Sequence, residues 1–187
     1  MKSLTMLLLG LVATMTASSR GAGNLLRAAE TSAPPAAIGI YDSRVIAYAH
    51  FWSDANQRKL TEMTKAAKAA KAAGQTERFA ELEAALKSAQ EKSHLQVFST
   101  APVDEVLAEM KDRQPAMQKE AGVATLVSKW DETALKKYKR ARQVDVTDLF
   151  LREFKLDEKQ MKVAQDIRKK KPLPLDQARE LIRQGKL

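Results

Sequence analysis

The sequence contains no cysteine and few aromatic residues, and both shortages limit the kinds of protein it can be. Without cysteine the chain has no disulfide, no thiolate metal ligand and no thiol nucleophile, so it folds by packing alone. Aromatic residues make up 5% of the 187 residues, whereas charged residues make up 29%. This balance favours long, partly solvated helices over a large β-sandwich or a doubly wound α/β enzyme.

The motifs that mark common enzyme classes are also missing. The sequence has no glycine-rich phosphate loop, no Gly-x-Ser-x-Gly turn and no His-Glu-x-x-His helix. His50 stands four residues before Asp54, but a metal site needs at least one further ligand, and a helix cap at Asp54 is the simpler interpretation. We therefore expect a protein that is not an enzyme and needs no cofactor and no metal.

Acidic residues are outnumbered by basic ones. Lys and Arg total 32 against 23 Asp and Glu, which gives a net charge of +9 and an isoelectric point near 9.7. Such a chain attracts anionic partners, among them nucleic acid, acidic lipid and acidic polypeptide. The run at 136–142 holds five positive charges around Tyr138, a pattern typical of nucleic-acid contact in a cytosolic protein or of a solvated basic face.

The N-terminal residues decide between these partners. Met1-Lys2-Ser3 precedes an apolar run from Leu4 to Met15, which is too short to span a bilayer and is followed by small residues. We interpret 1–23 as a signal peptide and expect export to the periplasm, with an uncleaved anchor as the alternative. Export makes nucleic acid an improbable partner. Residues 24–37 contain two prolines and little apolar periodicity, which predicts a flexible leader.

Two long helical segments dominate the middle of the chain. Ser53 is placed to cap a helix that ends before Gly74, and a return helix follows. Leu82 belongs to a heptad-like series in the return helix, which predicts a seam and hence an antiparallel hairpin at about 53–98. The alternative to a projecting hairpin is an ordinary antiparallel helix pair packed within a globular domain. The expected elements are a strand at 38–41, a short helix from Val45, helices at 53–73 and 77–98, strands at 123–128 and 144–146, and a helix capped by Thr147-Asp148.

This order of elements resembles the Skp/OmpH family of periplasmic chaperones for outer-membrane proteins. The resemblance rests on the strand-like start Ile38-Gly39-Ile40-Tyr41-Asp42-Ser43-Arg44-Val45, the helical hairpin, the return through Ala121 to Ser128 and the closing Val144-Asp145-Val146-Thr147-Asp148-Leu149. It covers residues 38–154. The shorter hairpin and the breaks at Pro102 and Pro115 depart from the family pattern. The resemblance implies a mainly α fold with a small β body, in which the hairpin projects from a small sheet that trimerisation completes.

The resemblance also implies a function, that of an ATP-independent holdase for unfolded outer-membrane or exported proteins. Trimerisation would supply partners for short strands that cannot bury both faces alone. On the hairpin, basic and apolar side chains together suit weak, multiple contacts with a client; the candidate client-facing residues are Lys65, Lys68, Lys71, Phe79 and Leu82.

The last segment, 155–187, lies outside the resemblance. Two weak amphipathic helices flank a basic, proline-containing stretch at 168–174. We interpret it as a basic helical extension that either contacts anionic lipid or acts as a solvated linker with a small docking helix. The alternative function is accordingly a structural or adaptor protein of the envelope that binds anionic surfaces through basic helices, and the least favoured is a nucleic-acid binder.

Overall fold

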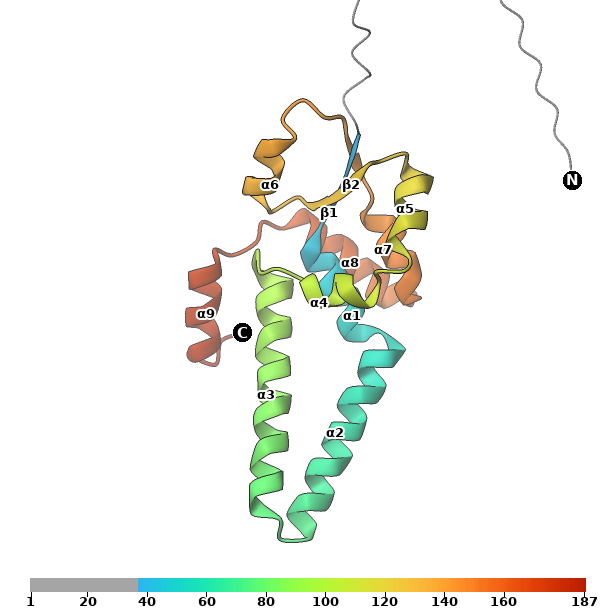
Figure 1. Ribbon diagram of the computed structural model, residues 1–187. Helices are drawn as coiled ribbons and strands as arrows, with labels where there is room; N and C mark the ends of the chain where they lie inside the picture. Colours follow the sequence, from blue (N-terminus) through green and yellow to red (C-terminus); the bar gives the residue numbers. More distant parts are fainter. Residues whose placement is uncertain (1–36) are drawn as a thin grey trace, which may run out of the picture. The chain divides into compact units, whose positions relative to one another are not determined.

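The computed structural model describes residues 37–187, which form a mainly helical body around a small three-stranded sheet, as the sequence predicts (Figure 1). The predicted signal peptide at 1–23 and all but the last residue of the predicted leader at 24–37 lie outside the described residues. The elements are β1 (Ile38–Tyr41), α1 (Ser43–Trp52), α2 (Asp54–Ala72), α3 (Thr76–Phe98), α4 (Asp104–Glu109), α5 (Gln114–Ala121), β2 (Thr125–Ser128), α6 (Glu132–Lys137), β3 (Gln143–Asp145), α7 (Thr147–Phe154), α8 (Glu158–Lys169) and α9 (Leu175–Arg183).

The sheet has the order β2-β1-β3, and both pairings are parallel. Ile38 of β1 stands opposite Thr125 on one side and Gln143 on the other. The three strands therefore pair with one another within one chain, although they lie far apart in the sequence. Along the described chain β2 and β3 are the two edges of the sheet, and each has one side without a strand neighbour.

Gly39 is the residue that lets the three strands approach one another. A Cβ at this position would lie 2.9 Å from Leu126 Cδ2 and 3.1 Å from both methyl carbons of Val146. Those two side chains come from β2 and from the residue after β3, so any side chain at position 39 would push the flanking strands apart.

Helix α1 is the central helix of the body. The Asp42 side chain caps its first turn by accepting a hydrogen bond from the Arg44 N–H at 3.2 Å. Ile46 packs into one cluster with Phe150 of α7 and side chains of α4 and α5, whereas Val45 packs into a second cluster with Ala164 of α8. The almost unbroken apolar run at 45–49 is explained by this burial on two sides.

Short helices α4 and α5 follow the local signals in the sequence. Pro115 occupies the first turn of α5, where its missing N–H leaves no bond unmade. Gly122 ends that helix at φ 62°, a left-handed conformation that favours glycine.

Helices α2 and α3 run in opposite directions and extend away from the sheet (Figure 1). Ser53 caps α2, and Gly74 at φ 68° lies in the turn before α3. Near this turn the two helices pack through a small cluster of Ala67, Ala70 and Leu82. Alanine side chains allow a close approach there but bury little apolar surface.

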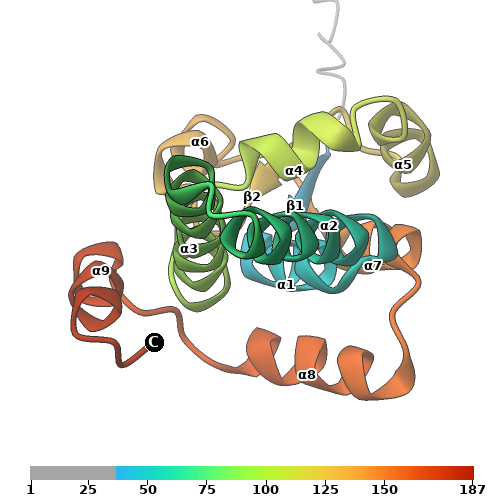
Figure 2. The same ribbon diagram turned by 90° about the horizontal axis from the view of Figure 1, so that it is seen from below.

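The C-terminal helices lie beside different parts of the molecule. Helix α8 packs along α1, while α9 lies next to α3 on the side away from α2 (Figures 1 and 2). Ala164 of α8 is fully buried. The segment after residue 155 therefore completes the core around α1 and belongs to the same compact unit as the sheet.

Candidate functional site

An open groove of about 800 Å³ lies between α2 and α3. Apolar side chains form most of its surface, with a few polar and charged groups around them. The lining residues are Phe51, Leu60, Thr64, Ala80, Glu83, Ala84, Leu86, Lys87 and Gln90. A hollow of this size, open to solvent and apolar at its base, suits the side chains of a bound polypeptide segment.

The corner between α1 and α2 sets the course of α2 beside this groove. Ser53 is the residue at the corner, with an extended backbone at ψ 145°. Its hydroxyl donates to the His50 carbonyl at 2.7 Å and accepts from the Asn56 N–H at 3.3 Å. These bonds end one helix and begin the next, so α2 leaves α1 on a different axis and separates from α3 near the body (Figure 1).

Aromatic side chains lie at the body end of the groove. Phe51 lines it and stacks edge-on against Trp52, with ring centroids 5.2 Å apart. The ring centroids of Tyr48 and Trp52 lie 6.5 Å apart. Trp52 is 42% exposed, so it belongs to the surface of the body. An exposed aromatic group beside an apolar groove extends the surface on which a partner can pack.

The five candidate client-facing residues lie outside the lining of the groove. Lys65, Lys68 and Lys71 are exposed on α2, and Lys71 Nζ lies 5.2 Å from the ring centroid of Phe79. Leu82 is 8% exposed because it packs between Ala67 and Ala70, so its role is in the seam and not on a free surface.

Sequence reasoning missed the residues that form the walls. Ala80 and Ala84 stand one helical turn apart on α3, a spacing that places both on one face. The sequence does show this alanine pair beside the heptad-like series. The groove, however, depends on the angle between α2 and α3, and no short-range sequence pattern encodes that angle.

A polar cluster lies at the root of the helix pair, where α1, α3 and α4 meet. His50 Nε2 lies 2.9 Å from Glu109 Oε2, so the partner of this histidine is on α4 and is not Asp54. Lys92 Nζ lies 2.9 Å from Glu105 Oε1. Partial burial raises the pKa of Glu105, but bonds from Lys92 and Gln96 outweigh burial and lower that pKa below its ordinary value. These pairs fasten α4 to α1 and α3.

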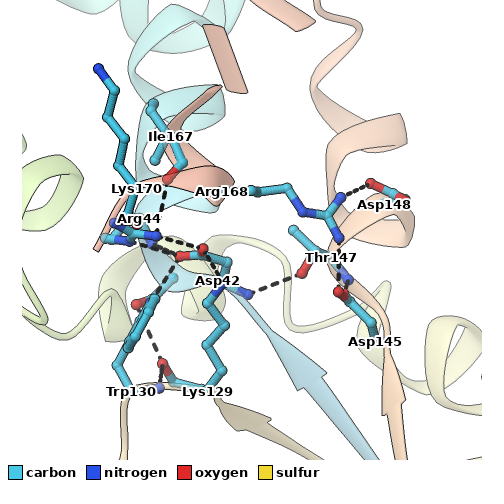
Figure 3. A network of polar contacts seen from close by, with 12 residues as sticks. Asp42, Arg44, Lys129, Trp130, Asp145, Thr147, Asp148, Ile167, Arg168 and Lys170 are labelled. Carbon is cyan, nitrogen blue, oxygen red and sulfur yellow. Dashed lines mark hydrogen bonds and ion pairs between the residues drawn. The ribbon is translucent and has the colours of Figure 1, made fainter. Parts of the chain in front are cut away.

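A fully buried carboxylate lies at the carboxyl end of β1, where Figure 3 shows several side chains converging on Asp42. Its carboxylate is 1% exposed. Oδ1 accepts from Arg44 Nε at 3.1 Å and from Trp130 Nε1 at 2.9 Å, and Oδ2 accepts from Lys129 Nζ at 2.6 Å. Burial raises the pKa of Asp42, but these bonds and the Arg44 charge lower it below its ordinary value.

Arg44 connects this network to the C-terminal segment. Its guanidinium donates to the Lys170 carbonyl at 2.9 Å and to the Ile167 carbonyl at 3.1 Å, both at the C-terminal end of α8. The same group lies 4.6 Å from the centroid of the Trp130 ring. Arg44, Lys129 and Trp130 all donate to the Asp42 carboxylate, and through Arg44 the network joins the end of β1 to the end of α8.

Two observations limit the chemistry of the part of the chain from residue 37 onward. No group of three or more His, Cys, Asp or Glu side chains is arranged to hold a metal ion there. Within the same residues no helix has the length and apolar character needed to cross a membrane. Comparison with protein-family models, with curated proteins and with solved structures gives no match to this chain.

Proposed function

We propose that this protein is an ATP-independent holdase that binds unfolded exported polypeptides, outer-membrane proteins among them, in the periplasm. The observation that carries the proposal is the open, apolar groove between α2 and α3 with Trp52 exposed beside it. Binding of this kind needs no cofactor, because a chaperone that sequesters an unfolded chain opposes aggregation by mass action.

The surroundings of the groove favour weak, reversible binding. Its walls include Ala80 and Ala84, which leave room for bulky client side chains, while Glu83 and Lys87 keep the rim polar. The lysines of α2 add positive charge close by, and such charge speeds the encounter with acidic segments. Many small contacts hold a client without burying it irreversibly.

A trimer is part of the proposal. It is supported by the resemblance to the Skp/OmpH pattern and by the unpaired outer sides of β2 and β3 along the described chain. Three copies would place three helix pairs around one client and multiply weak contacts. Sedimentation equilibrium of the chain without residues 1–23 should give three times the monomer mass, and a stable folded monomer at micromolar concentration would contradict this part.

The test of the groove uses two neighbouring alanines on α3. Ala84 lines the groove and Ala85 does not, yet both are exposed on the same helix. Ala84→Glu places a charged side chain in the groove, while Ala85→Glu adds the same charge outside it, and glutamate keeps helix propensity high in both. The assay measures aggregation of a denatured outer-membrane β-barrel protein diluted into each variant.

We expect Ala84→Glu to lose most of the suppression and Ala85→Glu to keep it. Equal activity of both variants would remove the groove from the proposal, and no suppression by the wild type at any molar ratio would defeat the holdase itself. Added salt should slow capture while part of the holding activity remains, because apolar contacts retain the client.

A second candidate is an envelope adaptor that binds anionic surfaces, and one observation favours it. Four basic residues from the end of α6 to the start of β3 have no ion-pair partner among residues 37–187. Lys136, just before them, forms a long ion pair with Glu132 at 3.9 Å. These four are Lys137, Lys139, Arg140 and Arg142. Binding to anionic vesicles that falls log-linearly with salt, together with no suppression of aggregation, would favour this candidate.

A further inference from the structure

Helix α9 has few side-chain ties to the rest of the molecule. Its ion pairs, Arg179 with Asp176 and Arg183 with Glu180, lie within the helix itself. Within the described chain no ion pair and no side-chain hydrogen bond joins α9 to another element. Helix α9 therefore lies against α3 without a polar side-chain tie among the described residues.

That packing is small. Ala178 is fully buried, but Leu175, Leu181 and Ile182 all remain partly exposed. The helix has 9 residues and no side-chain cap at its start, and a helix of this length is marginal by itself in water. Such an element opens at a lower free energy than the buried core does.

The tether keeps α9 close even when it is undocked. The Leu173 N–H donates to the Phe98 carbonyl at 2.8 Å, and Arg44 holds the Lys170 carbonyl upstream. Only Pro174 separates Leu173 from the first residue of α9. A short tether gives an effective concentration in the millimolar range, so a weak contact is mostly closed at rest.

The surface beneath α9 belongs to a helix that already lines the candidate groove on its other side. Figure 2 shows α9 and α2 on opposite sides of α3. Phe98, at the end of α3 beside Leu173, is a large apolar side chain that is 43% exposed. The chemistry that fits this face is visible in α9, a short amphipathic helix with apolar residues three or four positions apart.

We infer that the face of α3 beneath α9 is a second polypeptide-binding surface, and that α9 is a detachable internal occupant that an amphipathic client segment displaces. This inference rests on the proposed holdase function for its client, although the docking of α9 can be tested without one. The apparent affinity of the face for a client equals its intrinsic affinity multiplied by the fraction of molecules in which α9 has left it.

The variants change one residue each in the full chain. Ala178→Glu puts a charge where the side chain is fully buried and should undock α9, while Gln177→Glu adds the same charge at an exposed position of the same helix. Hydrogen exchange should show α9 amides freed in Ala178→Glu alone, with α8 amides unchanged. Leu181→Gln serves as a second undocking variant if Ala178→Glu disturbs the body by circular dichroism.

The direct probe is a labelled synthetic peptide of residues 172–187. The peptide should bind the undocked variant. It should bind Gln177→Glu and the wild type at least about tenfold more weakly, because α9 occupies the face in both. A peptide that itself carries Ala178→Glu should not bind. Absence of peptide binding to the undocked variant would overturn the inference.

Client capture is the second readout. The undocked variant should capture a denatured β-barrel protein about fivefold to tenfold more tightly than Gln177→Glu, and the added peptide should reverse that gain. Unchanged capture with α9 amides freed would overturn the inference while leaving the groove intact. If no variant captures a client, the holdase function fails, whereas peptide binding still decides whether the face accepts a helix.

Discussion

The body and the α2–α3 pair are held together in different ways. In the body, large side chains such as Ile46 and Phe150 are fully buried, and the Asp42 carboxylate is enclosed by Arg44, Lys129 and Trp130. The seam of the helix pair is made by two alanines and Leu82, with Phe79 and Leu86 partly buried beside them. One region excludes water and satisfies its polar groups internally, whereas the other leaves apolar surface open.

The difference follows from side-chain size and has a functional consequence. Large buried groups and a closed polar network leave the body one well-defined arrangement. Small seam residues let α2 and α3 touch near the turn and separate near the body, so a groove remains where they diverge. A well-packed body that carries a helix pair with a small seam and an open groove suits the binding of unrelated polypeptide segments.

The largest expected effect is in the body. Arg44→Met removes the guanidinium from a buried carboxylate and uncovers the last carbonyls of α8, so we expect the free energy of unfolding to fall by about 3–5 kcal/mol. Urea denaturation followed by circular dichroism measures it. The matched control is Arg78→Met in the exposed pair with Glu81 on α3, which should cost less than about 0.5 kcal/mol. Similar losses for the two variants would contradict the contrast between the regions.

Alkaline pH should weaken the body through Tyr41. Burial, with the Asp104 and Asp131 charges adding to it, raises the pKa of Tyr41 from 10.0 to about 12. The folded protein favours the neutral phenol, so the contribution of Tyr41 to the free energy of unfolding is fully present below pH 10. It is lost as pH rises toward 12, a change on the order of 2 kcal/mol. Tyr41→Phe keeps the contact with Phe150 and should remove this part of the alkaline loss. A wild type and a variant that lose stability equally between pH 9 and pH 11.5 would refute it.

Two glycine substitutions separate the regions on a smaller scale. Gly39→Ala forces a Cβ against Leu126 and Val146, and overpacking of this kind costs about 1–3 kcal/mol. At Gly74 an added Cβ meets nothing within 4 Å, so Gly74→Ala costs about 1 kcal/mol from its left-handed backbone alone. Thermal unfolding compares the two. A Gly74→Ala loss larger than the Gly39→Ala loss would contradict the tight packing assigned to the sheet.

The smallest expected change in stability comes from the exposed lysines of α2. Replacing Lys65, Lys68 and Lys71 together with Gln keeps helix propensity nearly constant and should alter the free energy of unfolding by less than about 0.5 kcal/mol. The same variant should capture a client more slowly at low salt. A large loss of stability would mean that these side chains hold the helix pair together, and urea denaturation would reveal it.

Much of the fold follows from local signals in the sequence, and the candidate site does not. Ser53, Gly74 and Gly122 mark helix ends through capping or left-handed backbone, and the structure confirms each boundary within a residue or two. The short strands were also predictable from their β-branched residues. Local patterns of this kind act over a few residues, which is the range that sequence reasoning covers well.

Longer-range relations escaped that reasoning for a physical reason. Arg44 reaches a carbonyl 126 residues away at Lys170, and nothing near either residue encodes the meeting. The groove likewise depends on the angle at Ser53 between two helices. The sequence predicts a client-facing surface for Leu82, because apolar character alone does not say whether a leucine faces a partner or, as here, Ala67.

Hydrogen exchange of the full chain, with and without a denatured β-barrel client, tests the central claim most directly. The account predicts added protection along the groove at 60–64 and 80–90, with the amides of β1 and of the first turn of α1 unchanged. Protection that appears instead around Asp42 and Lys129, with none on α2 and α3, would contradict it.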